Sequence, residues 1–234
     1  MIPIGRPFLE YVISALADAG LADVCLVIAP HHDAIREHFE RRVQTERVRI
    51  HFAVQPVPRG SADALLAAQD FAESDHFVVV NSDNYYPVHT LRGLRDVCLD
   101  RAYGVAAFER EALIRLSNID ASRVLQYSIL ELDEHGRLAR IIEKPTPAQL
   151  AAQRGGVFVG MNSWALGPSI FRACREIAPS QRGELELPLA AQYAREKLGV
   201  PFRVLTFHEG VLDLSTRADI AAVAERLRDV VPTL

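Results

Sequence analysis

Two aspartates, Asp83 and Asp213, each come directly after a short apolar run and before residues that favour turns or helix starts. Asp83 lies in the stretch NSDNYYP, which follows the apolar residues 77–80, and Asp213 lies in VLDLST. An aspartate in such a place either caps a turn or helix, or serves as an oxygen ligand for Mg²⁺. Because two acids share the same local setting, a role as metal ligands becomes a stronger interpretation than it would be for one such aspartate.

The strand before Asp83 is one of several short apolar strands that alternate with helices. Residues 24–28, 77–80 and 103–108 have the length and composition of strands, and a helix opens at Ser61. Short apolar strands separated by helices are typical of a parallel sheet covered on both faces. We therefore expect an α/β fold with an open, mostly parallel sheet, in which the strand before Asp83 is buried. Ligands of such sheets gather at the carboxyl ends of the strands, which is where Asp83 lies.

The second half of the chain has a different pattern. Residues 127–132 and 137–142 flank the turn DEHG, which predicts a β-hairpin. The other expected elements are a loop over 145–156, a strand over 157–166, a helix with Pro168 in its first turn, a helix from about Glu184, a strand over 202–207 and a helix after Thr216. We expect one domain over residues 1–234.

Composition limits the classes of function. The 234 residues are 49% hydrophobic and carry a net charge of −4, which argues against a general binder of nucleic acid or membrane surfaces. No apolar run approaches the length of a membrane span, and the first residues lack the layout of a signal peptide. The three cysteines are far apart in apolar segments and predict reduced thiols. We expect a soluble, cytoplasmic protein.

Five segments, in order along the chain, resemble the sugar-1-phosphate nucleotidyltransferases, the family of glucose-1-phosphate thymidylyl- and uridylyltransferases. QPVPRGSADAL is similar to the family's Gln-Pro-x-x-x-Gly-x-Ala-x-Ala segment, and NSDNYY to its Gly-Asp-Asn metal strand. The predicted hairpin, which ends in EKP, resembles a Tyr-Gly hairpin that ends in Glu-Lys-Pro. PSQRGELEL and VLDLST resemble an Arg-Gly-Glu-Leu-Glu segment and a terminal Asp-x-Gly-Thr motif. The resemblance implies a Rossmann-like nucleotide-diphospho-sugar transferase fold, with a nucleotide-binding half of about 1–110 and a sugar-phosphate-binding half of about 111–234.

The resemblance also implies a reaction. An oxygen of a sugar 1-phosphate attacks the α-phosphorus of a nucleoside triphosphate, UTP or dTTP, and pyrophosphate leaves. Both reactants are anions, so catalysis depends on positioning and charge neutralisation. Asp83 and Asp213 would hold Mg²⁺, and Lys144 would meet the sugar phosphate. The other substrate-binding residues that the resemblance implies are Gln55, at the base edge, Gly60, Ser61, Asn84, Ser128, Glu143, at the sugar hydroxyls, Asn162 and Glu184.

Several of these assignments have an ordinary alternative. Lys144 could be a solvated lysine at a strand end, but the chain has 24 arginines and only two lysines, and one of the two stands in the motif. Glu184 is equally well explained as a first-turn helix residue, and Asn162 as a structural amide. His31, His32 and Asp33 have no partner at metal-ligand spacing and predict a polar loop and helix start. Trp164 is most simply a core residue.

The sequence also departs from the family pattern. It contains no Gly-x-Gly-Thr-Arg loop, the segment that cradles the triphosphate in the family, and we expect a central strand to be lacking with it. Ser128 replaces a glycine, and Val211 and Ser215 replace the usual Trp and Gly around the terminal Asp. Two interpretations follow: a shortened form of an active enzyme, or a non-catalytic relative that binds nucleotide or sugar phosphate. A glycosyltransferase is a third, weaker interpretation. Such enzymes commonly use two acids spaced by one residue, and the segment SDN supplies only one. The resemblance further implies a possible homo-oligomer.

Overall fold

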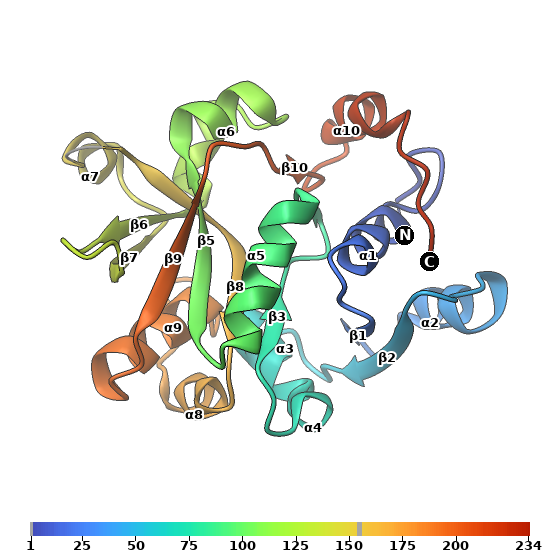
Figure 1. Ribbon diagram of the computed structural model, residues 1–234, viewed down its shortest axis with the longest axis horizontal. Helices are drawn as coiled ribbons and strands as arrows, with labels where there is room; N and C mark the ends of the chain where they lie inside the picture. The colour runs from blue at the N-terminus through green and yellow to red at the C-terminus, as the bar shows by residue number, and fades with distance from the viewer. Residues whose placement is uncertain (1, 154–155) are drawn as a thin grey trace.

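A six-stranded sheet with helices packed against it organises the computed structural model, which describes residues 2–153 and 156–234 (Figure 1). Strands β3, β5, β6 and β9 run in one direction, and β7 and β8 run in the other. The mixed α/β class and the mostly parallel strand direction expected from the sequence are therefore confirmed. The strands of this sheet are β3 (Phe77–Val79), β5 (Tyr103–Glu109), β6 (Ser128–Leu132), β7 (Leu138–Glu143), β8 (Phe158–Leu166) and β9 (Phe202–Phe207).

Two pairs of strands lie outside the main sheet. β1 (Asp23–Ile28) and β2 (Arg49–Val54) form a separate parallel pair, and β4 (Asn84–Tyr85) and β10 (Leu212–Asp213) form a short antiparallel pair. Within the described residues, β3 has one strand partner, β8, and β1 has one, β2.

The expectation that the strand before Asp83 is buried is wrong. Residues 77–80 are only half-buried. The reason is that β3 is hydrogen-bonded along one edge, so its second edge and part of its side chains lack a covering neighbour. The expectation that a central strand is lacking stays a prediction.

Helices fill the connections between these strands, as the alternating sequence pattern predicts. A π-helix (His38–Arg42) and a 3₁₀-helix (Arg123–Gln126) accompany them. The α-helices are α1 (Phe8–Asp18), α2 (Asp33–Glu37), α3 (Ser61–Ala67), α4 (Gln69–Ala72), α5 (Val88–Leu99), α6 (Arg110–Leu116), α7 (Pro147–Ala151), α8 (Ser169–Glu176), α9 (Leu187–Lys197) and α10 (Asp219–Leu227). No helix in the described ranges is both long and apolar enough to cross a membrane.

The prediction of a loop over residues 145–156 is wrong for its first part, because α7 forms over Pro147–Ala151. Thr146 accepts a hydrogen bond from the Gln149 backbone while the Gln149 side chain bonds back to Thr146, a reciprocal capping box that starts the helix. Residues 154 and 155 lie outside the described ranges. The helix expected from about Glu184 begins later, at Leu187, because Pro188 sits in its first turn.

The core lies between the sheet and its helices. Trp164 is fully buried at 0% exposure, as a core residue should be, and packs edge-on to Phe202. Strand β8 is irregular at residues 161–163, where its register with β5 shifts. Asn162 lies in this bulge with a left-handed φ of 51°. A bulge re-aims side chains along a strand, so Asn162 departs from the regular alternation of β8.

Candidate active site

Asp83 and Asp213 meet where β4 pairs with β10. Asp213 lies opposite Asn84 across the pair, and the Leu214 amide donates to the Asp83 carbonyl at 2.8 Å. Burial, together with the negative charge of Asp213, raises the pKa of Asp83 above its usual value. The structure therefore brings the two aspartates close enough for their charges to interact, although 130 positions separate them in the sequence.

The Asp213 carboxylate is held on both of its oxygens. Its Oδ2 accepts from Arg123 Nη2 at 2.5 Å and from the Tyr127 hydroxyl, and its Oδ1 accepts from Ser215 Oγ at 2.5 Å. Asp213 is 1% exposed, so these contacts replace water. Arg123 also contacts Asp219 Oδ1 through Nη1 at 2.5 Å. One guanidinium thus bridges two buried carboxylates.

The charge balance of this cluster suits a divalent cation. Arg123 pairs with the carboxylates of Asp213 and Asp219, and Asp83 adds a third carboxylate, which the charge of Asp213 opposes. With all three ionised, the cluster carries two negative charges in excess of its one guanidinium, in a largely buried place. Buried charges need a partner. No group of three or more His, Cys, Asp or Glu residues in the described ranges is placed to hold a metal. Two carboxylates with phosphate and water oxygens are a normal Mg²⁺ environment, so the donor set fits that ion.

Lys144 forms a second charged cluster. Its Nζ lies 3.4 Å from Glu186 Oε1 and 3.7 Å from Glu143 Oε1, and Arg182 Nη1 lies 3.8 Å from Glu186 Oε1. Burial, and then the charge of Glu186, raise the pKa of Glu143 to about 7, while Lys144 opposes the shift. The Lys144 side chain is 34% exposed, so its ammonium group remains accessible to a ligand.

Two hydrogen bonds connect the two clusters. The Lys144 amide donates to the Tyr127 carbonyl at 3.2 Å, and the Tyr127 hydroxyl donates to Asp213. Tyr127 stands at the end of the 3₁₀-helix, directly before hairpin strand β6, and Glu143 ends the partner strand β7. The hairpin therefore places Lys144 on the same side of the molecule as the aspartates.

Gln55, Gly60 and Ser61 lie together where β2 leads into α3. Gln55 Nε2 donates to the Gly60 carbonyl at 3.2 Å and to Asp63 Oδ2 at 2.8 Å. Gly60 has a φ of 119°, and a Cβ there would lie 2.5 Å from the Leu185 carbonyl oxygen, so close packing on Leu185 requires glycine. Ser61 Oγ accepts from the Leu187 amide at 2.8 Å at the start of α9. The segment 185–187, which includes Glu186, thus links this corner to Lys144.

The remaining predicted site residues are not all placed to touch a substrate. Asn84 is 3% exposed and accepts from the Tyr86 hydroxyl at 3.2 Å. Ser128 is 2% exposed, and its hydroxyl donates to the Gly160 carbonyl at 3.4 Å inside the sheet. Glu184 is half-buried and lies 3.4 Å from Arg182, while Asn162 is half-buried in the β8 bulge. Asn84 and Ser128 therefore support the backbone of the site.

Sequence reasoning missed the residues that hold the aspartates. Arg123 and Asp219 have no motif around them, and their contact joins residues 96 positions apart. Tyr127 and Glu186 stand inside quoted segments, YSILEL and GELEL, and could have been singled out as polar residues beside predicted site residues.

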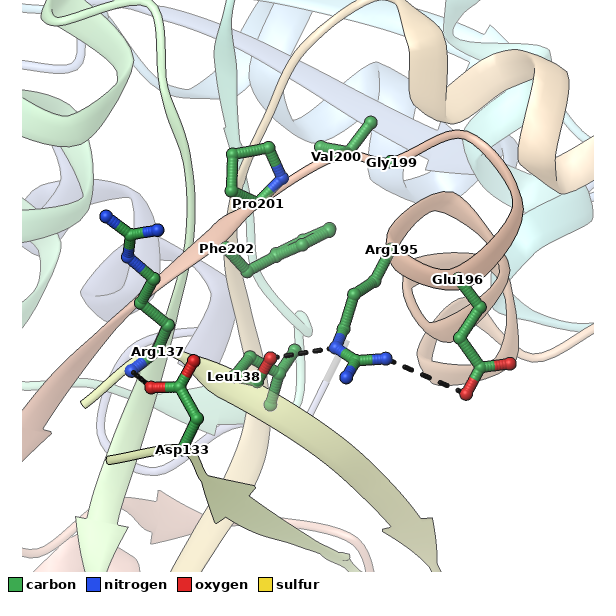
Figure 2. A pocket seen from close by; sticks show the side chains of 9 residues that line it. All are labelled: Asp133, Arg137, Leu138, Arg195, Glu196, Gly199, Val200, Pro201 and Phe202. Atoms are coloured by element: carbon green, nitrogen blue, oxygen red, sulfur yellow. Dashed lines mark hydrogen bonds and ion pairs between the residues drawn. The ribbon is translucent and has the colours of Figure 1, made fainter. Parts of the chain in front are cut away.

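A groove of about 480 Å³ lies at the other end of the sheet. It is formed where α9 leads into β9, and Figure 2 shows Arg137 and Arg195 on its two sides with Pro201 and Phe202 between them. Arg195 Nε donates to the Leu138 carbonyl at 2.8 Å, and Arg195 Nη1 lies 3.8 Å from Glu196. β3 and β9 run in the same direction, so a groove at the start of β9 lies away from Asp83, which follows the end of β3. None of the predicted site residues lines it.

Comparison with proteins of known sequence gives relatives that are named as nucleotidyltransferases. The chain is 31% identical over 189 residues to a glucose-1-phosphate thymidylyltransferase of Xanthomonas campestris pv. campestris, covering 80% of this chain and 59% of the relative. It is 26% identical over 185 residues to the UTP-glucose-1-phosphate uridylyltransferase AglF of Haloferax volcanii, covering 78% and 68%. The low-salt glycan biosynthesis nucleotidyltransferase Agl11 of the same organism is 29% identical over 198 residues, 50% of its own length. The chain thus spans about half to two thirds of these relatives.

Solved structures show the same fold. A UDP-glucose pyrophosphorylase complexed with UDP-glucose matches with a TM-score of 0.79 at 15% identity, covering 97% of this chain and 89% of that one. A UTP-bound UGPase from Acinetobacter baumannii matches with a TM-score of 0.77 at 16% identity, covering 98% and 85%. The model of the family described as "Nucleotidyl transferase" matches residues 1–200. The chain therefore belongs to the nucleotidyl transferase family.

Proposed function

We propose that this chain forms the core of a Mg²⁺-dependent enzyme that joins a nucleoside triphosphate, UTP or dTTP, to a sugar 1-phosphate. The products are a nucleoside diphosphate sugar and pyrophosphate. The observation that carries the proposal is the convergence of Asp83 and Asp213 across the β4–β10 pair, with two negative charges in excess. Family membership and the names of the relatives support the reaction class.

The proposed reaction forms one bond and breaks one. An oxygen of the sugar phosphate bonds to the α-phosphorus, and the bond from that phosphorus to the oxygen bridging to the β-phosphate breaks, so the electron pair leaves with pyrophosphate. Mg²⁺ held by Asp83 and Asp213 would neutralise phosphate oxygens and align the two anions. Arg123 and Tyr127 keep Asp213 in place, since they occupy its Oδ2.

Lys144 has the properties of a group that binds the sugar phosphate. Its ammonium charge is balanced by Glu186 and Glu143 at 3.4 and 3.7 Å, distances longer than those of a tight ion pair. An arriving phosphate can compete for this ammonium group, because neither contact is short. Glu143, half-buried beside it, can accept hydrogen bonds from sugar hydroxyls in its ionised form.

The non-catalytic alternative has its own supporting observation. Near the site, Arg123 is bound to Asp213 and Asp219, and Lys144 and Arg182 face Glu186. A chain whose site cations are already engaged can bind nucleotide or sugar phosphate without turning them over.

The three cysteines are free thiols, which supports a reducing compartment such as the cytoplasm.

A ligand panel with and without Mg²⁺ tests the proposal. We expect UTP or dTTP to raise the melting temperature of the full chain only when Mg²⁺ is present, and glucose 1-phosphate to raise it further. Pyrophosphate release measured on the same samples separates the enzyme from the non-catalytic relative. Nucleotide-induced shifts of equal size with and without Mg²⁺ would argue against the role of the two aspartates.

A further inference from the structure

The side-chain amide of Gln55 is fixed by two neighbours from α3. Gln55 follows β2, and its own amide N–H donates to the Ile28 carbonyl at 2.9 Å, so its backbone is anchored to β1. Its Nε2 donates to the Gly60 carbonyl at 3.2 Å and to Asp63 Oδ2 at 2.8 Å. Both hydrogens of the NH₂ group are therefore committed to these two contacts.

The chemistry of these partners determines which way the amide faces. A backbone carbonyl and an ionised carboxylate can only accept hydrogen bonds, so the group that faces them must be the NH₂ and not the oxygen. Gln55 Oε1 is then directed to the other side. In the described ranges it has no hydrogen-bond partner, and it is not among the buried unpaired atoms, so it is open to an incoming ligand. This residue thus offers a ligand an acceptor and no donor.

We propose that Asp63 is a specificity-determining residue that holds Gln55 as a hydrogen-bond acceptor and so selects uracil or thymine over cytosine. The inference rests on the proposed function and on the expectation, from the family resemblance, that Gln55 meets the base edge. Uracil and thymine carry an N–H at ring position 3, whereas cytosine has a lone pair there. Gln55 Oε1 accepts from the first and repels the second. A site built to hydrogen-bond one group discriminates strongly against an analogue that lacks it.

Asp63 acts through Gln55, so it is a positioning residue. It occupies one of the variable positions of the Gln-Pro-x-x-x-Gly-x-Ala-x-Ala segment, between Ala62 and Ala64. It lies in the first turn of α3, where the helix dipole favours its negative charge. An asparagine at this position presents a donor as well as an acceptor. Only the Gly60 carbonyl, 3.2 Å from Gln55 Nε2, then opposes a turn of the Gln55 amide that presents its NH₂ to the base.

The experiment is a comparison of UTP and CTP binding, with Mg²⁺, to the full chain and to Asp63→Asn, by ligand-observed NMR titration. We expect the wild type to favour UTP, and the ratio of the two dissociation constants to fall by about tenfold in Asp63→Asn, the effect of one hydrogen bond. Asp70→Asn, an exposed change on α4, is the matched control and should keep the wild-type ratio. Asp63→Ala, which removes the acceptor without adding a donor, should also lower the ratio.

Two results would overturn the proposal in distinguishable ways. If the wild type favours UTP and both Asp63 variants keep that preference, Asp63 does not set specificity, and the proposed function still stands. If the wild type binds neither nucleotide, the proposed function fails and the inference falls with it. Melting temperatures of all variants, measured without ligand, show that the comparison is made on folded protein.

Discussion

Arg123 Nη2 lies 2.5 Å from Asp213 Oδ2, and the pair joins the 3₁₀-helix before the hairpin to the short strand β10. Asp213 is 1% exposed, and the Arg123 side chain 16%. The second nitrogen of the same guanidinium contacts Asp219 at the start of α10. A single cation therefore ties together three segments of the chain that carry the candidate site.

Replacing Arg123 by glutamine should destabilise the protein strongly. The change leaves Asp213 and Asp219 buried without a cation, and breaking a buried ion pair in this way costs about 3–5 kcal/mol. Urea denaturation at pH 7 measures the free energy of unfolding. Arg115→Gln, an exposed change on α6, is the control and should stay within about 0.5 kcal/mol of the wild type. Equal stability of the two variants would contradict the bridging role.

Asp83→Asn should remove divalent-metal binding and leave the protein folded. Burial raises the pKa of Asp83, so the charged carboxylate is costly where it stands and a neutral amide of the same shape is tolerated. Titration with Mn²⁺, followed by electron paramagnetic resonance, reports the free ion directly. Asp75→Asn is the matched control. Asp75 is an exposed aspartate just before β3, whereas Asp83 lies after the end of β3. Unchanged Mn²⁺ affinity in Asp83→Asn would remove the main support for the metal site.

Glu143 should make stability fall as pH rises. Burial and Glu186 raise its pKa from 4.5 to about 7, so between these values the folded state binds a proton that the unfolded state has lost. The free energy of unfolding then decreases with pH across this window and stays low above it. Glu143→Gln cannot ionise, and we expect it to be more stable than the wild type by up to about 3 kcal/mol at pH 8, with the difference vanishing below pH 4.5.

Urea denaturation of the wild type and Glu143→Gln at pH 5 and pH 8 measures this dependence. Glu134→Gln, a change in the exposed hairpin turn, should show no difference between the two pH values relative to the wild type. If the advantage of Glu143→Gln is the same at both pH values, Glu143 does not titrate near neutrality.

The sequence predicted the elements that depend on local pattern. The hairpin strands β6 and β7, the long strand β8 and the strand β9 occur where the apolar pattern and the turn residues placed them. The half-exposure of β3 could not be predicted, because it depends on how many neighbours a strand acquires in the sheet. α7 was missed because its start signal, a capping box at Thr146 and Gln149, stands in a stretch rich in proline and glycine.

The candidate site was predictable to the extent that its residues stand in ordered motifs. Asp83 comes directly before β4, Asp213 ends β10 and Lys144 follows β7. Tyr127 connects Lys144 to Asp213, and the Leu214 amide connects Asp83 to β10. Ser128 and Asn84 stand in the same motifs but turn inward, because one residue's shift along a strand reverses the face of its side chain. Arg123 could not be found from spacing, since its partners are fixed only when β10 folds against the segment before the hairpin.

Lys144→Ala should weaken binding of a sugar 1-phosphate and spare nucleotide binding. The Lys144 ammonium group lies with Glu143 and Glu186 at the end of β7, and its link to Asp213 runs through Tyr127 rather than by direct contact. Loss of a charged hydrogen bond to phosphate should weaken binding of glucose 1-phosphate by about 10- to 100-fold. Calorimetric titrations with glucose 1-phosphate and with UTP measure the two affinities separately. The chain offers a matched control in its only other lysine, because Lys197 is exposed at the end of α9 and its change to alanine should alter neither affinity. If Lys144→Ala and Lys197→Ala bind glucose 1-phosphate equally well, the sugar phosphate does not meet Lys144, and Arg182, which also faces Glu186, becomes the next residue to test.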